Sequence, residues 1–314
     1  MQTNLILSKW LAVGIILLFI GTAIIPSNGQ QIEKISLPTS TGNTLYVGGS
    51  GPGNYTRIID AISNSSDGDT IFVYHGTYQE KVTIDKAINL VGENRFNTTI
   101  TGYSTYVGKC INIVSAYVNV SGFTLKNSAE GLRISSGINH RIFNNIIENN
   151  GNFGILIMEP SQHNQICNNS IYNNGDGLSC DGDTDCSIFN NEIYSNGDGI
   201  CLYGSSYTHV ASNNIYGNGI GVYVSSPNAI IKNNNIDSNS KDAKFKISRL
   251  SDIYSFLFEY NYWGLLKYRF KIIPGVIEKT FGSGYYSIKI RFPWFALDLN
   301  LRNKPYNISS FENN

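Results

Sequence analysis

The sequence predicts an all-β fold, a right-handed parallel β-helix with about 22 residues in each coil. A similar segment recurs through residues 141–239, and every copy has an isoleucine at the same place. These isoleucines are Ile147, Ile171, Ile193, Ile215 and Ile236, separated by 24, 22, 22 and 21 residues. A period of this length is typical of a solenoid, in which each unit buries its apolar face against its neighbours.

Two columns of asparagine follow the same period and favour a β-helix over a helical repeat. They lie two positions before and three positions after the isoleucines: Asn145, Asn169, Asn191, Asn213 and Asn234, and Asn150, Asn174, Asn196, Asn218 and Asn239. Asparagine tolerates the left-handed backbone of tight turns. Identical amides stacked at the strand spacing can also hydrogen-bond to one another. Helical repeats do not need such columns.

Three short β-rich pieces lie between the turns of each unit. The first contains Ile142, Ile166, Ile188, Val210 and Ile231, and the second contains the isoleucine column. In the third piece, apolar residues such as Leu178 and Cys180 alternate with residues such as Ser179. This period of two places one set inside and the other outside. Three strands and three turns in each unit therefore predict the β-helix.

The flanking segments complete the predicted organisation. Residues 1–29 are expected to be a signal peptide or an N-terminal anchor, because Lys9 precedes an apolar run that ends before a small-residue triplet. Residues 30–66 are expected to form a spacer and an N-terminal cap, with a short helix over residues 55–63, and residues 67–244 the coils. Residues 245–314 are rich in aromatic residues and are expected to close the C-terminal end, with an exposed binding patch as the alternative.

Charge and sequence motifs limit the partners. The chain has a formal net charge of zero, which argues against a nucleic-acid partner because such a partner requires a basic stripe. Export to the cell surface or the medium is expected, with membrane contact only through an uncleaved N-terminal segment.

Exported chains are glycosylated at Asn-X-Ser/Thr triplets where the host has the enzymes. The candidate sites are Asn54, Asn64, Asn97, Asn119 and Asn307, with a further triplet at Asn168 inside a repeat turn.

The early coils also resemble a known class of proteins. The segments GDTI at residues 68–71, GTY at 76–78, KAINLVGEN at 86–94 and TTITG at 98–102 precede the asparagine-rich coils. Together they resemble the NosD-like, carbohydrate-binding-and-sugar-hydrolase class of right-handed β-helix proteins, of the archaeal exported type. The resemblance implies the fold over residues 45–306. It leaves the activity open, because the class includes binding proteins, copper-delivery accessories, lyases and hydrolases.

A column of tyrosines is the first candidate site. Tyr172, Tyr194 and Tyr216 each follow an isoleucine of the core column and are therefore expected on the outside of adjacent coils. Rings separated by the strand spacing of about 4.8 Å would offer an apolar surface with polar edges, on which sugar rings stack. The alternative is a ladder of rings that only stiffens the sheet.

A pair of aspartates is the second candidate. Asp176 and Asp198 occupy identical Asn-Gly-Asp-Gly turns on adjacent coils, in an exterior column expected to include Glu130 and Asn152. Their backbones should lie about 4.8 Å apart. Two carboxylates this close can share a proton or a cation, and the spacing is near the roughly 5 Å of a retaining glycosidase. Asp between glycines is also a common turn residue.

Metal binding has one weak candidate in the sequence. Asp181, Asp183 and Asp185 alternate along a loop, as oxygen ligands of calcium do, although Cys186 occupies the position where an EF-hand requires glycine. An acidic surface loop is the alternative. No other cofactor is expected.

Copper would require clustered His, Met and Cys side chains. The four histidines fall at different repeat positions, so the sequence predicts no copper site. Five cysteines leave at least one thiol unpaired. Cys180 is expected in the core and Cys201 outside, and a disulfide between Cys167 and Cys186 is one conceivable pairing.

These observations favour an exported β-helix that binds carbohydrate without catalysis, or serves as a surface-structural module, with a polysaccharide or cell-surface glycan as its partner. One alternative is a polysaccharide hydrolase or lyase that uses Asp176 and Asp198, but the sequence shows no substrate clamps beside them. A copper-delivery accessory is the other alternative.

Overall fold

The computed structural model describes residues 42–182, 185–226, 228–247, 257–259, 261–263, 271–281, 288–298 and 304–305. The chain divides into two compact units, Met1–Thr39 and Ser40–Asn314. The expected signal segment, residues 1–29, lies outside the described residues, so the fold described below is that of the second unit. Among the described residues, no helix has the length and apolar character needed to cross a membrane.

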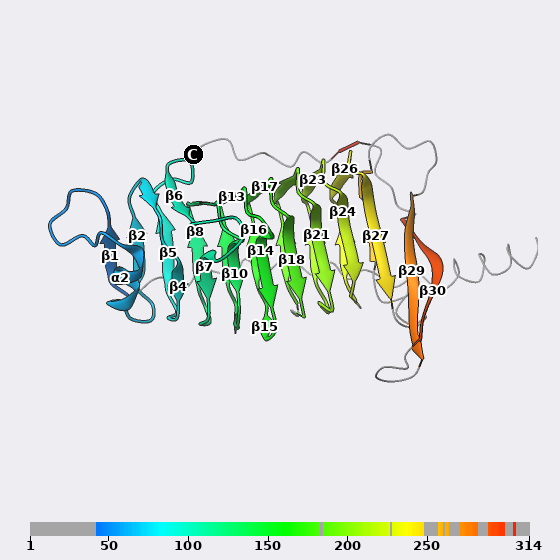
Figure 1. The fold of residues 1–314 in the computed structure, drawn as a ribbon, viewed down its shortest axis with the longest axis horizontal. Helices are drawn as coiled ribbons and strands as arrows, with labels where there is room; N and C mark the ends of the chain where they lie inside the picture. Colours follow the sequence, from blue (N-terminus) through cyan, green and yellow to red (C-terminus); the bar gives the residue numbers. More distant parts are fainter. Residues whose placement is uncertain are drawn as a thin grey trace, which may run out of the picture. The chain divides into compact units, whose positions relative to one another are not determined.

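The fold is a parallel β-solenoid, as the sequence predicts. Three strands of each coil join three sheets, which we call sheets A, B and C, and strands at the same position of successive coils pair in parallel (Figure 1). Sheet A consists of β1 (Thr44–Val47), β2 (Thr70–Val73), β5 (Asn89–Gly92), β8 (Asn119–Ser121), β12 (Arg141–Phe143), β16 (Gln165–Cys167), β19 (Ser187–Phe189), β22 (His209–Ala211), β25 (Ile230–Lys232) and β28 (Leu257–Glu259).

Sheet B consists of β3 (Gly76–Tyr78), β6 (Thr98–Thr101), β9 (Thr124–Lys126), β13 (Ile146–Glu148), β17 (Ser170–Tyr172), β20 (Glu192–Tyr194), β23 (Asn214–Tyr216) and β26 (Asn235–Asp237). Sheet C consists of β4 (Val82–Ile84), β7 (Lys109–Ile113), β10 (Glu130–Ile134), β14 (Phe153–Met158), β18 (Asp176–Asp181), β21 (Asp198–Tyr203), β24 (Ile220–Ser225), β27 (Lys241–Ile247), β29 (Lys271–Phe281) and β30 (Ile288–Asp298). A small separate pair, β11 (Gly137–Ile138) and β15 (Ser161–Gln162), lies between sheets C and A in sequence.

The core is made by the predicted apolar columns. Ile171 pairs with Ile147 on one side and with Ile193 on the other, and all three side chains are fully buried. Cys180 lies in the inward column of sheet C between Ile157 and Leu202, and it is also fully buried. The coil interior is therefore a stack of aliphatic layers, each completed by the neighbouring coils.

The two asparagine columns form buried amide ladders. In the first ladder, Asn191 Nδ2 donates to Asn213 Oδ1 at 3.0 Å, and Asn191 Oδ1 accepts the Asn169 backbone N–H at 3.0 Å. Each ladder amide also donates to backbone carbonyls, so the buried groups at these corners are paired. Asn261 continues this ladder beyond the regular repeat by accepting from Asn234 Nδ2 at 3.1 Å.

The left-handed backbone at these corners belongs to the preceding residue rather than to the ladder asparagine. Positive φ angles occur at Asn144, Asn168 and Asn190, one position before the first ladder, and at Asn149 and Asn173 before the second. The expectation that one asparagine column would serve both purposes is therefore wrong. The turn and the ladder use adjacent residues, because an amide that bonds along the axis must keep a fixed direction.

A glycine column permits close stacking at the start of the sheet C strands. A Cβ atom on Gly177 would lie 2.6 Å from the carbonyl oxygen of Gly199 and 3.0 Å from Ile193 Cγ2. The same crowding occurs at Gly154 and Gly199. A side chain at these positions would push neighbouring coils apart.

A short helix, α2 (Ile58–Ser63), packs on the first coils. It buries Ile58, Ala61 and Ile62, and it is shorter than the predicted 55–63. Glu80 accepts the backbone N–H groups of Ile58 and Ile59 at 3.0 and 3.2 Å, which places a carboxylate at the positive end of the helix.

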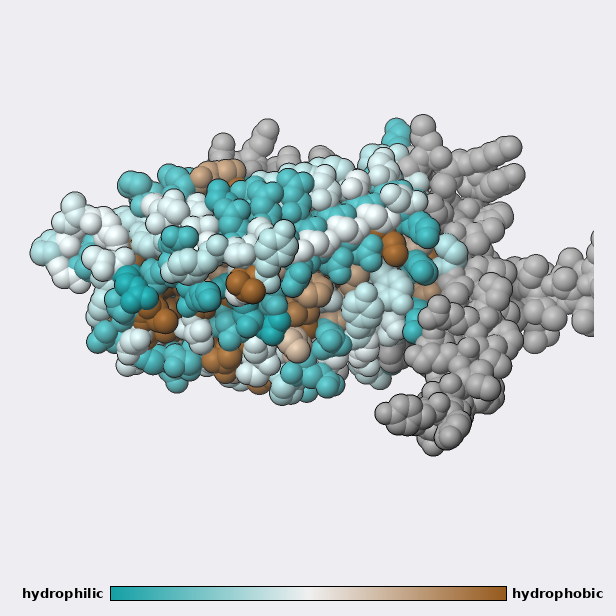
Figure 2. All heavy atoms as spheres, in the orientation of Figure 1, coloured by the Kyte–Doolittle hydropathy of each residue, from teal (hydrophilic) through white to brown (hydrophobic). Residues whose placement is uncertain are grey.

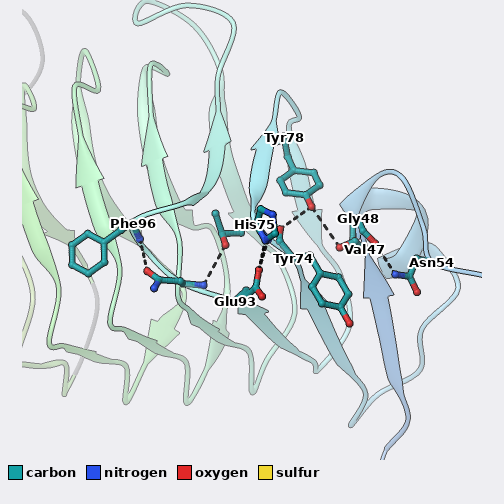
Figure 3. A network of polar contacts seen from close by, with 10 residues as sticks. Val47, Gly48, Asn54, Tyr74, His75, Tyr78, Glu93 and Phe96 are labelled. Atoms are coloured by element: carbon teal, nitrogen blue, oxygen red, sulfur yellow. Dashed lines mark hydrogen bonds and ion pairs between the residues drawn. The ribbon is translucent and has the colours of Figure 1, made fainter. Parts of the chain in front are cut away.

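The loop before α2 lies against Tyr74, which follows β2, and Tyr78, which ends β3 (Figure 3). The Tyr78 hydroxyl donates to the Tyr74 carbonyl at 2.9 Å, and Asn54 Nδ2 donates to the Gly48 carbonyl at 2.6 Å. Gly48 has φ +74° and lies against Tyr78, where a Cβ would meet the phenol oxygen at 2.3 Å. A glycine is therefore needed here for both space and backbone conformation.

At the C-terminal end the parallel pattern changes. Strand β29 pairs in parallel with β27 and antiparallel with β30, so a hairpin ends sheet C. Trp263 is 3% exposed and belongs to the core cluster. Phe245 is fully buried in the same cluster, and Tyr262 is half-buried. The late aromatic residues after Trp263, on which most of the closing role was predicted, lie outside the side chains that the structure describes.

Candidate functional site

The predicted tyrosines form a row of stacked rings on the outside of sheet B. Strands β17, β20 and β23 place Tyr172, Tyr194 and Tyr216 in register on adjacent coils. The ring centroids are 4.8 Å apart for the first pair and 5.1 Å for the second, with interplanar angles of 15° and 2°. Parallel rings in contact are about 3.5 Å apart, so these rings are offset and each leaves its edge, its hydroxyl and part of its face half-exposed.

Carboxylates border this row, which we call the tyrosine row. The Tyr216 hydroxyl donates to Glu192 Oε1 at 2.9 Å, and the Tyr172 hydroxyl is hydrogen-bonded to Glu148. Glu148 pairs with Tyr172 in the strand register, and Asp237 pairs with Tyr216 at the other end. Each end of the row is therefore followed by an acidic side chain.

The same carboxylates, together with burial, raise the pKa of the phenol groups. Burial between neighbouring rings raises the pKa of Tyr172, and the hydrogen bond to Glu148 adds to this effect. Burial also raises the pKa of Tyr216 and Tyr194, with a further contribution from Glu192. The three hydroxyls therefore remain protonated across the neutral range, and each hydroxyl oxygen can accept a hydrogen bond from a ligand.

A loop of residues 93–97 covers the outside of sheet B before the tyrosine row begins. The Arg95 carbonyl accepts the Thr124 hydroxyl at 2.6 Å, and Arg95 itself is 8% exposed. Burial lowers the pKa of Arg95, while the charge of Glu192 opposes that change. The neighbouring Phe96 is 61% exposed, and Figure 3 shows its ring pointing away from the polar network around His75 and Glu93.

The predicted acid pair also lies together. Asp176 and Asp198 are register partners on β18 and β21. Asp176 Oδ1 accepts the Asp198 backbone N–H at 3.1 Å, and Asp198 Oδ1 accepts the Ile220 N–H at 3.0 Å. Burial raises the pKa of Asp176, and the charge of Asp198 raises it further, although the bond to the Asp198 N–H acts against this.

The rest of that exterior column differs from the expectation. Phe153, not Asn152, pairs with Asp176, because the coil that contains Phe153 has one more residue before its third strand. Glu130 lies in this column as expected, but its partner is Phe153 and not Asn152, and it forms a close two-point ion pair with Arg133. That arginine therefore already has a carboxylate partner and is not a free substrate clamp.

Cys201 lies beside the aspartates. It occupies the exterior column between Ser179 and Tyr223, as expected, yet it is fully buried. Its Sγ is 3.8 Å from Asp198 Oδ2, and burial together with the two aspartates raises the pKa of the thiol. All five cysteines are buried free thiols, so the conceivable Cys167–Cys186 disulfide is not formed.

The structure describes only part of the acidic loop that contains Asp181, Asp183 and Asp185. Asp181 and Asp185 are exposed, and Asp185 Oδ2 bonds His163 Nδ1 at 2.9 Å. Asp183 lies outside the described residues. Calcium binding by Asp181, Asp183 and Asp185 stays a prediction.

The described residues do not fit a copper ion held by soft ligands. In the part of the chain that the structure describes, the one group of at least three converging His, Cys, Asp or Glu ligands is Asp176, Asp198 and Cys201, whose ligand atoms lie within 4.8 Å of one another. It contains one sulfur ligand, and that thiol is held protonated. His140 is buried, and its Nδ1 accepts the Val118 N–H at 3.3 Å.

The glycosylation candidates differ in access. Asn64 and Asn97 are exposed. Asn54 uses its amide in the loop contact described above, and Asn119 is 9% exposed with its Nδ2 2.7 Å from Asn89 Oδ1. A glycan on the Asn119 nitrogen would break that hydrogen bond. Asn307 lies outside the described residues.

Glu148 and Glu192 are the site residues that sequence reasoning missed. The sequence does indicate on which side they lie. Glu192 directly precedes Ile193 and Glu148 directly follows Ile147, which places both on the outside of sheet B. Their bonds to tyrosines follow only from the register of neighbouring coils. Arg95 could not be placed from the sequence, because its loop has no counterpart in the regular units.

Known proteins share this fold. The chain is similar to a pectin methylesterase, PemA, from Erwinia chrysanthemi, with TM-score 0.55 and 14% identity over 72% of this chain and 92% of the other. It is similar to a polygalacturonase from Erwinia carotovora, with TM-score 0.54 and 12% identity over 74% and 79%. An alginate lyase from Paenibacillus sp. gives TM-score 0.50 and 14% identity over 70% and 85%. At these identities the likeness shows the fold alone.

A comparison with curated proteins finds no similar sequence. A family model described as periplasmic copper-binding protein (NosD) matches residues 62–264. The match runs from the end of α2 to just beyond Trp263 and spans well over half of the chain. The chain therefore belongs to the NosD family.

Proposed function

We propose that this protein is an exported β-helix that binds polysaccharide without cleaving it, and that the tyrosine row is the contact surface. The observation that carries the proposal is the row of three offset rings on adjacent coils, at centroid separations of 4.8 and 5.1 Å. Each ring contributes an apolar strip and a hydroxyl, and Glu148 and Glu192 add hydrogen-bond acceptors beside them. An extended glycan presents the same combination of apolar ring faces and hydroxyls at a regular spacing.

Two further facts support the proposal. The structurally similar proteins named above are a pectin methylesterase, a polygalacturonase and an alginate lyase, which act on polysaccharides by their names. The NosD family is described as periplasmic, which agrees with export through the segment at residues 1–29. The described residues offer copper no soft-ligand site, so the proposed function involves no copper step.

The test is retention of the full chain by a panel of polysaccharides in affinity gel electrophoresis. Replacing Tyr172, Tyr194 and Tyr216 by Ala should reduce retention at least about tenfold, because each ring contributes roughly 1 kcal/mol or more of contact. The matched control replaces three exposed tyrosines elsewhere, Tyr46, Tyr117 and Tyr207, which are 43%, 55% and 59% exposed. Equal retention of the two triple variants would contradict the proposal and leave the row a stiffening ladder.

A polysaccharide hydrolase is the second candidate, and the raised pKa of Asp176 beside Asp198 favours it. A retaining glycosidase uses a carboxyl group of raised pKa beside a second carboxylate about 5 Å away, and ligand atoms of Asp176 and Asp198 lie within 4.8 Å of each other. Both carboxylates also serve as acceptors for backbone N–H groups of the next coil. Incubation with the same polysaccharides should release reducing ends that are lost in Asp176→Asn if this candidate is correct; no release by the unaltered protein would exclude it.

A further inference from the structure

We infer that the glycan bound by the tyrosine row is neutral or carries amino groups, and that polyuronates are excluded. This inference rests on the proposed function and adds the chemical class of the ligand. It follows from the charges on the outside of sheet B. It also separates the ligand of this chain from the acidic polymers named in the descriptions of its structural neighbours.

The outer face of sheet B is acidic along the tyrosine row. Glu148 precedes the row and Asp237 follows it in the same exterior column. Glu192 lies in the adjacent exterior column, and its Oε1 is 2.9 Å from the Tyr216 hydroxyl. A ligand that lies along the three rings therefore passes three carboxylates.

Of the two cations near the row, Lys126 is paired with a carboxylate and Arg95 is buried. Lys126 Nζ lies 3.6 Å from Glu148 Oε1, and the lysine side chain is 35% exposed. Arg95 is 8% exposed, and its carbonyl is bonded to Thr124 under the loop of residues 93–97. In the strand residues of sheet B that the structure describes, Lys126 is the one basic side chain on the outer face.

A polyuronate needs the opposite arrangement. Each sugar of such a chain carries a carboxylate, which requires an arginine or lysine partner when water is displaced. Along the tyrosine row it would meet carboxylates instead, and like charges this close repel. A neutral sugar can donate its hydroxyls to Glu148 and Glu192, and an amino sugar can add a charge-assisted hydrogen bond.

The hydrogen bonds of the tyrosine hydroxyls also suit a ligand that donates hydrogen bonds. The carboxylates of Glu148 and Glu192 already accept from Tyr172 and Tyr216, and the raised pKa of both phenols keeps those protons in place. Each carboxylate has further lone pairs that can accept from a ligand. The row is thus rich in acceptors, and Lys126, the one basic side chain on the outer face of the described sheet B strands, is already paired with Glu148.

The experiment compares four polymers in affinity gel electrophoresis at low ionic strength: hydroxyethyl cellulose, glycol chitosan, alginate and polygalacturonate. The full chain should be retarded by hydroxyethyl cellulose or glycol chitosan and not by the two polyuronates. The double variant Glu148→Gln and Glu192→Gln should bind glycol chitosan at least about threefold more weakly and gain retardation by alginate, because Lys126 then lacks its partner. The control variant, Asp85→Asn and Glu159→Gln, removes the same charge from exposed positions outside sheet B and should behave as the unaltered protein.

The outcomes separate this inference from the proposed function. Retardation by alginate or polygalacturonate that equals or exceeds that by the other polymers, and that is lost when the three tyrosines are replaced by Ala, would overturn the inference while the proposed function stands. An unchanged pattern in the double variant would also overturn it. Retardation by none of the four polymers would remove the proposed function itself.

Discussion

The coils between residues 141 and 239 and the earlier coils between residues 70 and 126 belong to one solenoid but are built differently. In the later coils the core residues of sheet A pair at steps of 24, 22, 22 and 21 residues, from Ile142 to Ile231. In the earlier coils Ile71 pairs with Leu90 and Leu90 with Val120, which are steps of 19 and 30 residues.

The buried amide ladders explain the difference. In the later coils an asparagine closes each of two corners, and a residue inserted between those corners would break several hydrogen bonds. The earlier coils have no such ladder over the described residues, and loops leave the solenoid at residues 93–97 and 102–108. Their side chains Phe96, Tyr103 and Tyr106 are 61%, 62% and 86% exposed.

This contrast also explains where the tyrosine row lies. A row of stacked rings requires the same number of residues between the two corners of each coil, because a shift of one residue turns the side chain to the other face. Only the ladder coils meet that condition. The irregular coils instead supply loops, and one of them lies against the later coils, where a Cβ on Gly151 would meet the Thr105 carbonyl.

The largest expected effect is the loss of a ladder amide. Asn196→Ala should lower the free energy of unfolding by at least about 3 kcal/mol, because it strands the partners of both its amide nitrogen and its oxygen. Asn119→Ala, in the earlier coils, removes one side-chain bond to Asn89 and should cost about 1 kcal/mol. Urea unfolding of both variants measures the difference; equal losses would show that the ladder does not set the stability of the later coils.

A second prediction concerns His140, at the boundary between the two kinds of coil. Its backbone N–H donates to Asn164 Oδ1 at 3.1 Å, and its Nδ1 accepts the Val118 N–H, so the ring takes the place of a ladder amide. Burial lowers the pKa of His140 to about 4 from an ordinary 6.5, and the bond to the Ser136 carbonyl opposes this only partly.

The sign of the effect follows from these pKa values. Between about pH 6.5 and 4 the unfolded chain binds a proton at His140 that the folded chain does not. Stability should therefore fall as the pH is lowered through that range, by up to about 3 kcal/mol. His140→Asn keeps an acceptor and removes the titration. The difference between the pH profiles of unfolding for the two proteins isolates this residue, and parallel profiles would refute the assignment.

The smallest effect is expected at the centre of the tyrosine row. Tyr194→Ala should lower the free energy of unfolding by about 1 kcal/mol, because the half-exposed ring loses two stacking contacts but no core packing. Thermal unfolding provides the measurement, with Tyr46→Ala in the earlier coils as the comparison. A loss as large as that of Asn196→Ala would mean that the row is part of the scaffold, and the binding test would then need Phe replacements instead.

Much of the fold could be predicted because its signals are periodic. The isoleucine column, the two asparagine columns and the alternation in sheet C each repeat often enough to fix the coil, the three strands and the inward residues. The irregular coils could not be predicted in this detail, because loops such as residues 93–97 have no counterpart in the other units. Asn261 was missed as a ladder residue for the same reason, since it follows Asn234 by 27 residues.

The candidate site divides in the same way. Repetition alone places Tyr172, Tyr194 and Tyr216 on one line and Asp176 above Asp198. It does not show that Phe153 replaces Asn152 in the acidic column or that Cys201 is buried beside Asp198, because both depend on how one particular coil fits its neighbour.

By itself, the sequence determined that the chain winds into stacked coils with aliphatic and amide columns inside, because periodicity is a one-dimensional property that survives without coordinates. Only the tertiary structure decided which exterior groups meet. The bonds from Tyr216 to Glu192 and from Lys126 to Glu148 join residues about one coil apart, and their partners are set by side-chain direction and coil register. Charge on a surface is a property of neighbours in space, and those neighbours are defined only when the coils are stacked.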